Sequence, residues 1–551
     1  MKIVSKRNLM IFVTIVVATA LCQSQTLIRV PQDQPTIQAG INAASNGDTV
    51  LVAEGTYHVN LVLKKKIVLA SLFITDGDTA HISKTILDGG SPAKTDSASV
   101  IIIGAGTDST TVVVGFTIQN GSGTRIYDAT SGWWKGGGGI FLTSGGASIR
   151  RNILTHNTMN SSDGVFGGGF AMWNTTAVMT DWVIEDNTII DNTITSTGAN
   201  PLGAEGGGAW VYGNGRFERN IVSRNVTIGG GYSRGGGMHL LGNIPTGSSN
   251  IIIANNLFRS NSSQIAGAIA MHSISTSSQP HVTLINNIIV ENTATTAGAF
   301  QIISGDFTMI NNTVAYNTAM DVAVSLAATR GTLAFRMLNN IFWDPGIVTE
   351  LNTASNVSAG YNDVRGGLAG TGNINADPLF VTSDTLYRLQ DTSPCIGAGT
   401  DSVTLGGLLV TAPLCDNMGN SRPSPPGSKH DLGAHESPLP NPRTSVLELE
   451  NVPQSFALSQ NYPNPFNPTT LVRYSLPSQS RVRLEVFNIL GQRVTVLVDE
   501  SQHAGVWEAN WNASGMASGV YFCRLQVTKT SGTSSSSVRT FVETKRMLLL
   551  R

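Results

Sequence analysis

Aromatic and histidine side chains recur at two fixed positions of a repeated segment, each time shortly after a Gly- or Ala-rich step. Counted from the end of each step, the second and fourth positions carry Phe141, Trp173, Trp210, Tyr212, His239 and His272. Sugar rings present apolar C–H faces and many hydroxyls, so a carbohydrate site needs flat aromatic groups beside polar ones. We therefore predict that these six residues bind polysaccharide.

Charged residues near these rings could carry out chemistry on a sugar. A β-elimination lyase needs a base and a cation, whereas a glycoside hydrolase needs two carboxyl groups at a set separation. The candidates are Lys135, Asp163, Glu205, Arg234 and His239. They would suit a polysaccharide lyase or a glycoside hydrolase, and the sequence leaves open whether the chain is an enzyme. No metal cluster or cofactor motif is evident, although calcium stays open as a ligand.

Four long loops connect to the strands that carry the rings. They span residues 121–135, 158–166, 193–205 and 226–234, and they hold Tyr127, Trp133, Trp134, Phe166 and Tyr232. Long loops on a rigid scaffold often carry function. We expect them to wall a groove whose floor is the exposed aromatic strand. The alternative is that the loops fold over the strand and bury the rings as a satellite core.

An asparagine repeat sets the architecture that positions these groups. At intervals of 25 to 36 residues, an Asn begins a short apolar stretch: Asn152, Asn187, Asn220, Asn256, Asn287, Asn312 and Asn340. In all but the last, a second Asn follows five residues later, and at Asn340 that place is taken by Pro345. A period of this size indicates a solenoid. The spacing pattern stops at Asn340.

Short strands fill each repeat. Apolar residues alternate with others after each Gly-rich step, and this period of two indicates strands with one buried face. Stacked coils would pair as parallel strands, and each corner Asn would bond its amide to the next coil. The sequence therefore predicts an all-β parallel β-helix in which the Asn residues form a structural ladder.

Composition and the N-terminus limit the class of protein. The 551 residues include 35 basic and 36 acidic ones, so no basic face favours nucleic acid. Residues 1–24 combine early Lys and Arg with an apolar run too short to span a bilayer, which predicts a cleaved signal peptide. No transmembrane segment is expected after its removal. Export would permit a disulfide, for which Cys395 and Cys415 are the candidates.

The N-terminal part resembles the right-handed parallel β-helix proteins of the pectate-lyase-like superfamily. The resemblance rests on "VPQDQPTIQAGINAASNGDTVLVAEGTYHVNL", "TILDGG" and "TTVVVGFTIQNG". It implies a right-handed β-helix over residues 25–345, with an N-terminal cap over 25–60. It does not fix an activity, because such folds host many functions. The paired Asp cluster of polygalacturonases and the Arg motif of calcium pectate lyases are missing.

The remainder divides into three parts. Residues 346–437 resemble the module that closes bacterial β-helices of this kind, and residues 438–455 form a linker. Residues 456–551 contain "NYPNPFNPTT", "VFNILGQRV" and "GVYFCRLQ", and they resemble the type A C-terminal sorting domain of the type IX secretion system, expected as a small β-sandwich. The resemblance implies export through the periplasm to the outer-membrane surface or the medium, with the secretion machinery as a partner.

Together these observations predict a secreted or cell-surface β-helix protein that binds polysaccharide, with lyase-like degradation as an added activity left open. The alternative is a non-catalytic structural or adhesin protein in which the solenoid is a spacer.

Overall fold

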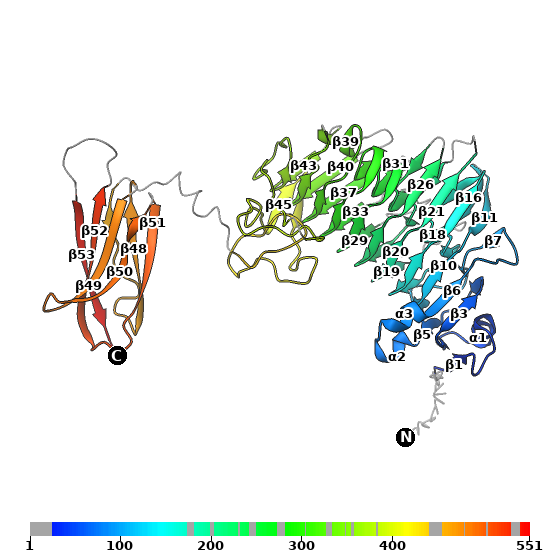
Figure 1. Cartoon of the computed structure of the whole chain (residues 1–551), viewed down its shortest axis with the longest axis horizontal. Helices are drawn as coiled ribbons and strands as arrows, with labels where there is room; N and C mark the ends of the chain where they lie inside the picture. The colour runs from blue at the N-terminus through cyan, green and yellow to red at the C-terminus, as the bar shows by residue number, and fades with distance from the viewer. Residues whose placement is uncertain are drawn as a thin grey trace, which may run out of the picture. The chain divides into compact units, whose positions relative to one another are not determined.

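The computed structural model describes residues 25–129, 131–173, 181–198, 203–229, 232–241, 250–272, 281–303, 305–326, 333–347, 349–353, 357–381, 384–439, 455–478, 480–502, 505–529 and 540–550. The chain forms two compact units, Met1–Asn441 and Pro442–Arg551 (Figure 1). The predicted signal peptide 1–24, and residues 440–454 of the predicted linker, lie outside the described residues.

Three parallel sheets run along the first unit. The first has twelve strands: β1 (Leu27–Val30), β2 (Thr49–Val52), β5 (Val68–Ser71), β9 (Val112–Val114), β14 (Ser148–Arg150), β19 (Trp182–Glu185), β24 (Gly215–Glu218), β29 (Asn250–Ala254), β33 (His281–Ile285), β37 (Gly305–Ile310), β40 (Leu333–Leu338) and β43 (Val357–Gly360). The second has eleven: β3 (Gly55–His58), β6 (Thr85–Asp88), β10 (Thr117–Gln119), β15 (Ile153–Thr155), β20 (Thr188–Ile190), β25 (Ile221–Ser223), β30 (Leu257–Arg259), β34 (Ile288–Val290), β38 (Thr313–Ala315), β41 (Ile341–Trp343) and β44 (Asp363–Val364).

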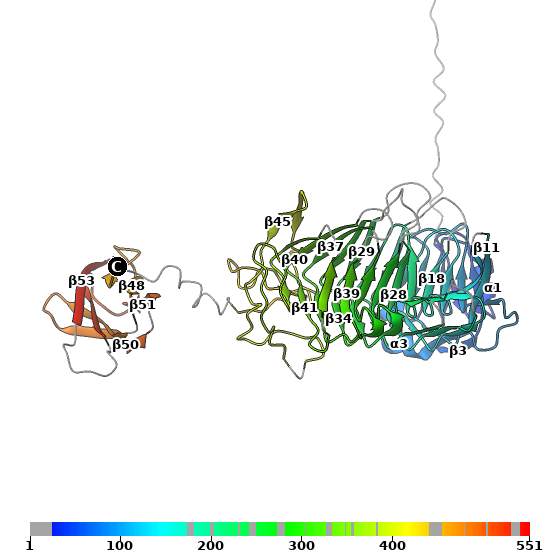
Figure 2. The same cartoon turned by 90° about the horizontal axis from the view of Figure 1, so that it is seen from above.

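The third sheet carries the predicted aromatic positions. Its ten strands are β4 (Leu61–Leu63), β8 (Ile101–Ile103), β13 (Ile140–Leu142), β18 (Phe170–Met172), β23 (Ala209–Tyr212), β28 (Met238–Leu241), β32 (Ile269–His272), β36 (Phe300–Ile302), β39 (Val322–Leu326) and β42 (Thr349–Thr353). In all three sheets the strands stack in sequence order along the solenoid (Figure 2). The predicted all-β class and parallel β-helix are therefore confirmed.

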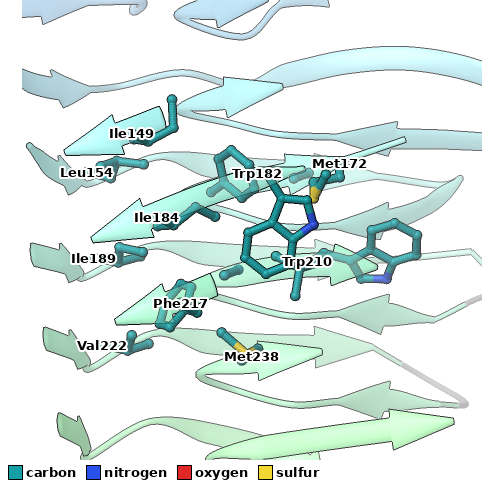
Figure 3. Close-up of a cluster of buried hydrophobic side chains, with 14 of the residues drawn as sticks. Ile149, Leu154, Met172, Trp182, Ile184, Ile189, Trp210, Phe217, Val222 and Met238 are labelled. Carbon is teal, nitrogen blue, oxygen red and sulfur yellow. The ribbon is translucent and has the colours of Figure 1, made fainter. Parts of the chain in front are cut away.

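Apolar side chains from the three sheets meet inside the coils. Figure 3 shows Ile149, Ile184 and Phe217 from the first sheet beside Leu154, Ile189 and Val222 from the second, with Met172 and Met238 from the third. All eight are buried. Because each coil contributes only a few of these side chains, it can bury them only against its neighbours, so the core is continuous along the solenoid.

Two hydrogen-bonded ladders of asparagine run through the coils. Asn220 is typical: its backbone N–H donates to Asn256 Oδ1 over 2.8 Å, and its Nδ2 donates to the same oxygen and to the carbonyl of Ile184. The second ladder repeats this arrangement from Asn157 to Asn317. Each buried amide thereby satisfies its own groups and ties two coils together.

The ladders extend beyond Asn340, where the sequence repeat stops. Asn340 N donates to Asn362 Oδ1, and Asn362 N donates to Asn373 Oδ1. In the second ladder, Asp344 takes the place expected at Pro345, and its Oδ1 accepts from Asn317 Nδ2. A carboxylate oxygen accepts the same bonds as an amide oxygen. A search for Asn at a fixed spacing therefore misses Asp344 as a member of the second ladder.

The residue before each ladder Asn turns the chain through a left-handed conformation. Arg151, Asp186 and Arg219 have φ between 50° and 57°. Such values are uncommon outside glycine, and here the bonds of the following Asn hold the corner. The charges on this column pair across coils, as between Arg219 Nε and Asp186 Oδ1 at 2.8 Å. Because these pairs are partly exposed, we assign them a minor share of the stability.

Short helices lie at the N-terminal end. They are α1 (Ile37–Ala43), α2 (Phe73–Asp76) and α3 (Ala80–Lys84). The Thr36 side chain caps α1 by accepting from Ala39 N, and Ile37 and Ile41 pack against the first coil. This covers the open end of the solenoid and its unpaired strand edges. No helix within the described ranges is both long and apolar enough to span a membrane.

The second unit is a two-sheet antiparallel domain. One sheet contains β47 (Ala457–Leu458), β48 (Thr469–Leu476) and β51 (Gly505–Asn512), and the other contains β50 (Arg493–Gln502), β49 (Ser480–Asn488), β52 (Gly519–Lys529) and β53 (Thr540–Leu549). One buried apolar cluster joins the two sheets, including Tyr474, Val486 and Leu525. This is the β-sandwich arrangement expected for residues 456–551.

Candidate functional site

The strand register places the predicted rings side by side. In the third sheet Phe141 pairs with Ala171, Ala171 with Trp210, and Trp210 with His239. Since neighbouring side chains on a strand point to opposite faces, these residues point away from the interior that holds Ile140, Leu142 and their equivalents. The sequence therefore predicted the direction of these side chains correctly.

The long loops do not wall a groove. Strands from these loops join three strands from other segments in a further sheet, here called the outer layer. The loop strands are β11 (Gly123–Asp128), β12 (Gly132–Gly136), β16 (Thr158–Ser161), β17 (Gly164–Phe166), β21 (Thr193–Ser196), β22 (Ala204–Glu205), β26 (Val226–Gly229) and β27 (Ser233–Arg234), and the others are β7 (Ser97–Ala98), β31 (Ser262–Ile265) and β35 (Thr293–Thr296). Each loop leaves the coil along one strand and returns along another. Met159, Val165, Ile194 and Ala204 form a small core within this layer.

The outer layer covers the predicted aromatic patch, so the predicted exposure of these rings is wrong. Phe141, Trp210, Tyr212 and His239 are all buried, and Trp173 is half-buried. His272 ends β32, and its side chain lies outside the described part of the structure. The arrangement is the satellite core named above as the alternative.

Aromatic rings of the outer layer pack against aromatic rings of the third sheet. Phe166, on the returning strand β17, lies 5.8 Å from Phe141, 5.3 Å from Trp173 and 5.0 Å from Trp210, measured between ring centroids. Trp134, on β12, lies 6.3 Å from Trp173. Gly136 and Gly164 leave room for these rings, because a Cβ at either position would clash with Phe166 or Trp134. Val165 and Phe166 both favour strands, and this was the signal available in the sequence.

Three of the five catalytic candidates come together where the outer layer meets the third sheet. Trp210 Nε1 donates to Glu205 Oε2 over 3.1 Å, and His239 Nδ1 lies 3.8 Å from the same oxygen. Arg234 pairs with Glu205 in the register of β22 and β27. Burial raises the pKa of Glu205 to about 7, although the Trp210 bond and the Arg234 charge act in the opposite direction. Glu205 and His239 are buried and Arg234 is half-buried, so the three form a polar cluster beside the rings.

The other two candidates lie apart from this cluster. Asp163 binds Arg125, with 2.8 Å between Oδ2 and Nε. Lys135 lies next to Trp134 on β12 and therefore points to the opposite face of the strand. Partial burial lowers the pKa of Lys135, while Asp96 and Asp163 raise it. The structure therefore places the candidates at two sites.

The outward face of the β11–β12 hairpin carries an exposed aromatic pair. Tyr127 and Trp133 are directly opposite across the two strands, with ring centroids 5.0 Å apart. Their exposed fractions are 61% and 45%. The Arg125 guanidinium lies 4.3 Å from the Trp133 ring centre, a cation–π contact. We call Arg125, Tyr127 and Trp133 the hairpin platform. The sequence placed both rings on a loop but gave no sign of the Arg125 contact.

The region after the solenoid holds charged groups in purely internal contacts. Arg422 Nη1 donates to Glu436 Oε2 over 2.8 Å, and both side chains are fully buried. Asp431 accepts from the backbone N–H groups of Gly397 and Ser437, each over 2.6 Å. In the described part of the chain, no group of three or more His, Cys, Asp or Glu side chains is arranged to hold a metal ion.

The expected disulfide between Cys395 and Cys415 is not formed. Cys395 is buried, and its Sγ donates to Asp363 Oδ2 over 3.2 Å, whereas Cys415 is an exposed free thiol. The two thiols therefore lie in different surroundings, although they are close in the sequence.

Replacing Glu205 with glutamine should change how stability depends on pH. A carboxyl whose pKa is raised on folding favours the folded state at low pH, and this contribution is lost as pH rises through the folded pKa. For Glu205 the loss falls between about pH 4.5 and 7 and amounts to about 3 kcal/mol. We expect Glu205→Gln to remove that part of the pH dependence in thermal unfolding, while the exposed Asp181→Asn leaves it intact. Equal pH profiles for the native chain and Glu205→Gln would contradict the burial of this carboxyl.

Comparison with known proteins identifies the second unit. Residues 460–538 match the family described as the secretion system C-terminal sorting domain. Among solved structures, the chain is similar to the Azotobacter vinelandii mannuronan C-5 epimerase AlgE6 A-module, at 17% identity and a TM-score of 0.24, over 62% of this chain and 94% of that chain. No curated protein sequence matches the chain.

The predicted type IX sorting domain is confirmed by this match, which spans all three of the motifs quoted above. The sorting tail indicates that the chain is exported and reaches the cell surface or the surroundings of the cell. It also implies that the type IX secretion machinery is a partner.

Proposed function

We propose that the β-helix unit is a polysaccharide-binding protein of the cell surface or medium, and that the hairpin platform is its contact face. The observation that carries this proposal is the exposure of Tyr127 and Trp133 beside Arg125. Two rings and a cation on a paired hairpin offer flat apolar area together with hydrogen-bond donors, as sugar binding requires. The sorting domain supports this proposal, because export would present this face outside the cell.

Binding is better supported than degradation. Glu205 in the outer layer and His239 beneath it are both buried, so a sugar has no direct access to them. Asp163 is engaged by Arg125, which reduces its availability as an acid or base. The second candidate function is a structural or adhesin role for the solenoid as a spacer. It is favoured by the unbroken stacking of coils from β1 to β43.

A glycan-array screen of the full chain tests this proposal. We expect Tyr127→Ala/Trp133→Ala to lower retention of the bound glycan about tenfold, since each aromatic contact contributes about 0.5–1.5 kcal/mol and tenfold corresponds to about 1.4 kcal/mol. Met320→Ala is the matched control, because Met320 is exposed on the same unit and lies far from the platform in sequence. An ultraviolet assay on the same glycans detects unsaturated products of a lyase. If the native chain retains no glycan, the spacer role replaces this proposal.

A further inference from the structure

The sorting domain has a concentration of exposed apolar residues that its fold does not require. Its exposed large apolar residues are Tyr462, Ile489, Leu490, Val496, Val506, Met516, Val542 and Leu550. The most exposed are Tyr462 at 81%, Leu490 at 76% and Ile489 at 70%. Exposed apolar groups that cluster on a soluble domain indicate an interaction surface.

The strand register places five of these eight at one end of the sandwich. Asn488, next to Ile489, pairs with Tyr521 near the start of β52, and Gly519 at that start pairs with Leu549. Thr469 at the start of β48 pairs with Asn512, which precedes the turn that holds Met516. Tyr462 bridges to Leu471 on β48. We call Tyr462, Ile489, Leu490, Met516 and Leu550 the apolar end.

Hydrogen bonds join the C-terminus of the chain to the loop that carries Tyr462. Phe466 N donates to the carbonyl of Leu548, and Leu550 N donates to the carbonyl of Phe466. Asn464 Oδ1 accepts from Leu548 N. The loop and the last residues therefore form one unit, and the apolar end is built from segments almost 90 residues apart in the sequence.

The turn that presents Ile489 and Leu490 is held by polar bonds alone. Asn488 Oδ1 accepts from the N–H groups of Leu490 and Gln492, each over 3.0 Å. Asn488 Nδ2 donates to Gln492 Oε1 over 2.9 Å, and Gly491 takes the positive φ of the turn. Turns of this kind form well with polar residues at the tip. Ile489 and Leu490 are therefore not needed to make the turn, and their exposure requires another reason.

We propose that the apolar end docks into an apolar recess of the type IX secretion machinery, with Ile489 and Leu490 as the central contact. The sorting role of this domain identifies the kind of partner. The chain enters the sandwich at the other end, where Ala457 pairs with Ser475, so the described entry strand does not cover the apolar end. A turn that is already hydrogen-bonded also loses little conformational freedom on binding. This proposal does not depend on polysaccharide binding.

Export of the full chain from a bacterium that has type IX machinery tests the docking surface. We expect Ile489→Ser/Leu490→Ser to lower the amount that reaches the surface and medium at least about tenfold, with the chain retained in the periplasm. The matched control is Val506→Ser/Val542→Ser, which changes exposed apolar residues placed toward the other end, and it should be exported like the native chain. The conservative Ile489→Val/Leu490→Met should also be exported normally.

Several results would overturn the proposal. These are native export of Ile489→Ser/Leu490→Ser, an equal loss for the control, or a loss for the conservative variant. If the serine variant accumulated at the cell surface, its defect would arise after the chain has crossed the outer membrane. This result would also contradict docking. Thermal unfolding of the purified chains should show no change in the sorting domain. A lower unfolding temperature of the sorting domain in the serine variant would contradict the exposure of Ile489 and Leu490, on which the proposal rests.

Discussion

Replacing Asn256 with alanine should lower the free energy of unfolding of the solenoid by about 3–5 kcal/mol. Asn256 Oδ1 accepts from Asn220 N and Nδ2, and its own Nδ2 donates to Phe217 O and Asn287 Oδ1. The side chain is fully buried, so alanine leaves several polar groups inside the core without water or protein partners. Denaturant unfolding of the native and variant chains, followed by far-ultraviolet circular dichroism, measures the loss.

Asn160→Ala provides the control for this experiment. Asn160 lies on β16 in the same unit, and it is exposed rather than buried. We expect its replacement to change the free energy of unfolding by less than about 0.5 kcal/mol. If Asn256→Ala and Asn160→Ala had the same small effect, the ladder would contribute little to stability and the corners would be held by strand pairing alone.

Replacing Trp210 with alanine should cost about 3–5 kcal/mol as well, for a different reason. The Trp210 ring packs against Phe166, Trp173 and Tyr212 between the two layers. Its removal leaves a cavity between the layers. Glu205 also loses the hydrogen bond that Trp210 Nε1 donates to it over 3.1 Å. The thermal unfolding midpoint should fall by several degrees. In addition, the tryptophan fluorescence of the remaining rings should shift to longer wavelength as water enters.

Trp133→Ala is the matched control, because it removes the same side chain from an exposed position. Trp133 is 45% exposed and contacts Tyr127 and Arg125 at the surface. We expect a loss below about 1 kcal/mol. A Trp210→Ala chain as stable as Trp133→Ala would mean that the outer layer does not seal the rings, and the groove interpretation would then be restored.

The sequence predicted the parallel β-helix well because the repeat is a local signal. Each ladder Asn, such as Asn187 or Asn220, precedes a strand by one residue, so spacing alone located the corners and the strands. The ends of the repeat were harder to predict. Asp344 and Asn362 continue the ladders at other spacings or with another residue type, so pattern matching stopped early.

The candidate site was predicted only in part, and the reason is physical. Alternation on β23 showed that Trp210 points away from the interior, but alternation does not show what lies on that side. The cover comes from Phe166 and Trp134, which belong to loops of earlier coils. A contact between separate coils leaves no local signal. The same limit applies to Cys395. Its short sequence distance to Cys415 suggested a disulfide, but in the structure its thiol binds the buried Asp363 instead.

The most direct test is hydrogen exchange of the full chain with and without a glycan retained in the array screen. Our account predicts that the glycan slows exchange in the peptides covering Gly123–Asp128 and Gly132–Gly136, which carry the hairpin platform. The peptide covering Ala209–Tyr212 should exchange slowly in both states, because it is already covered by the outer layer. Glycan protection confined to Ala209–Tyr212, with none in the hairpin, would contradict this account and place binding at the buried rings.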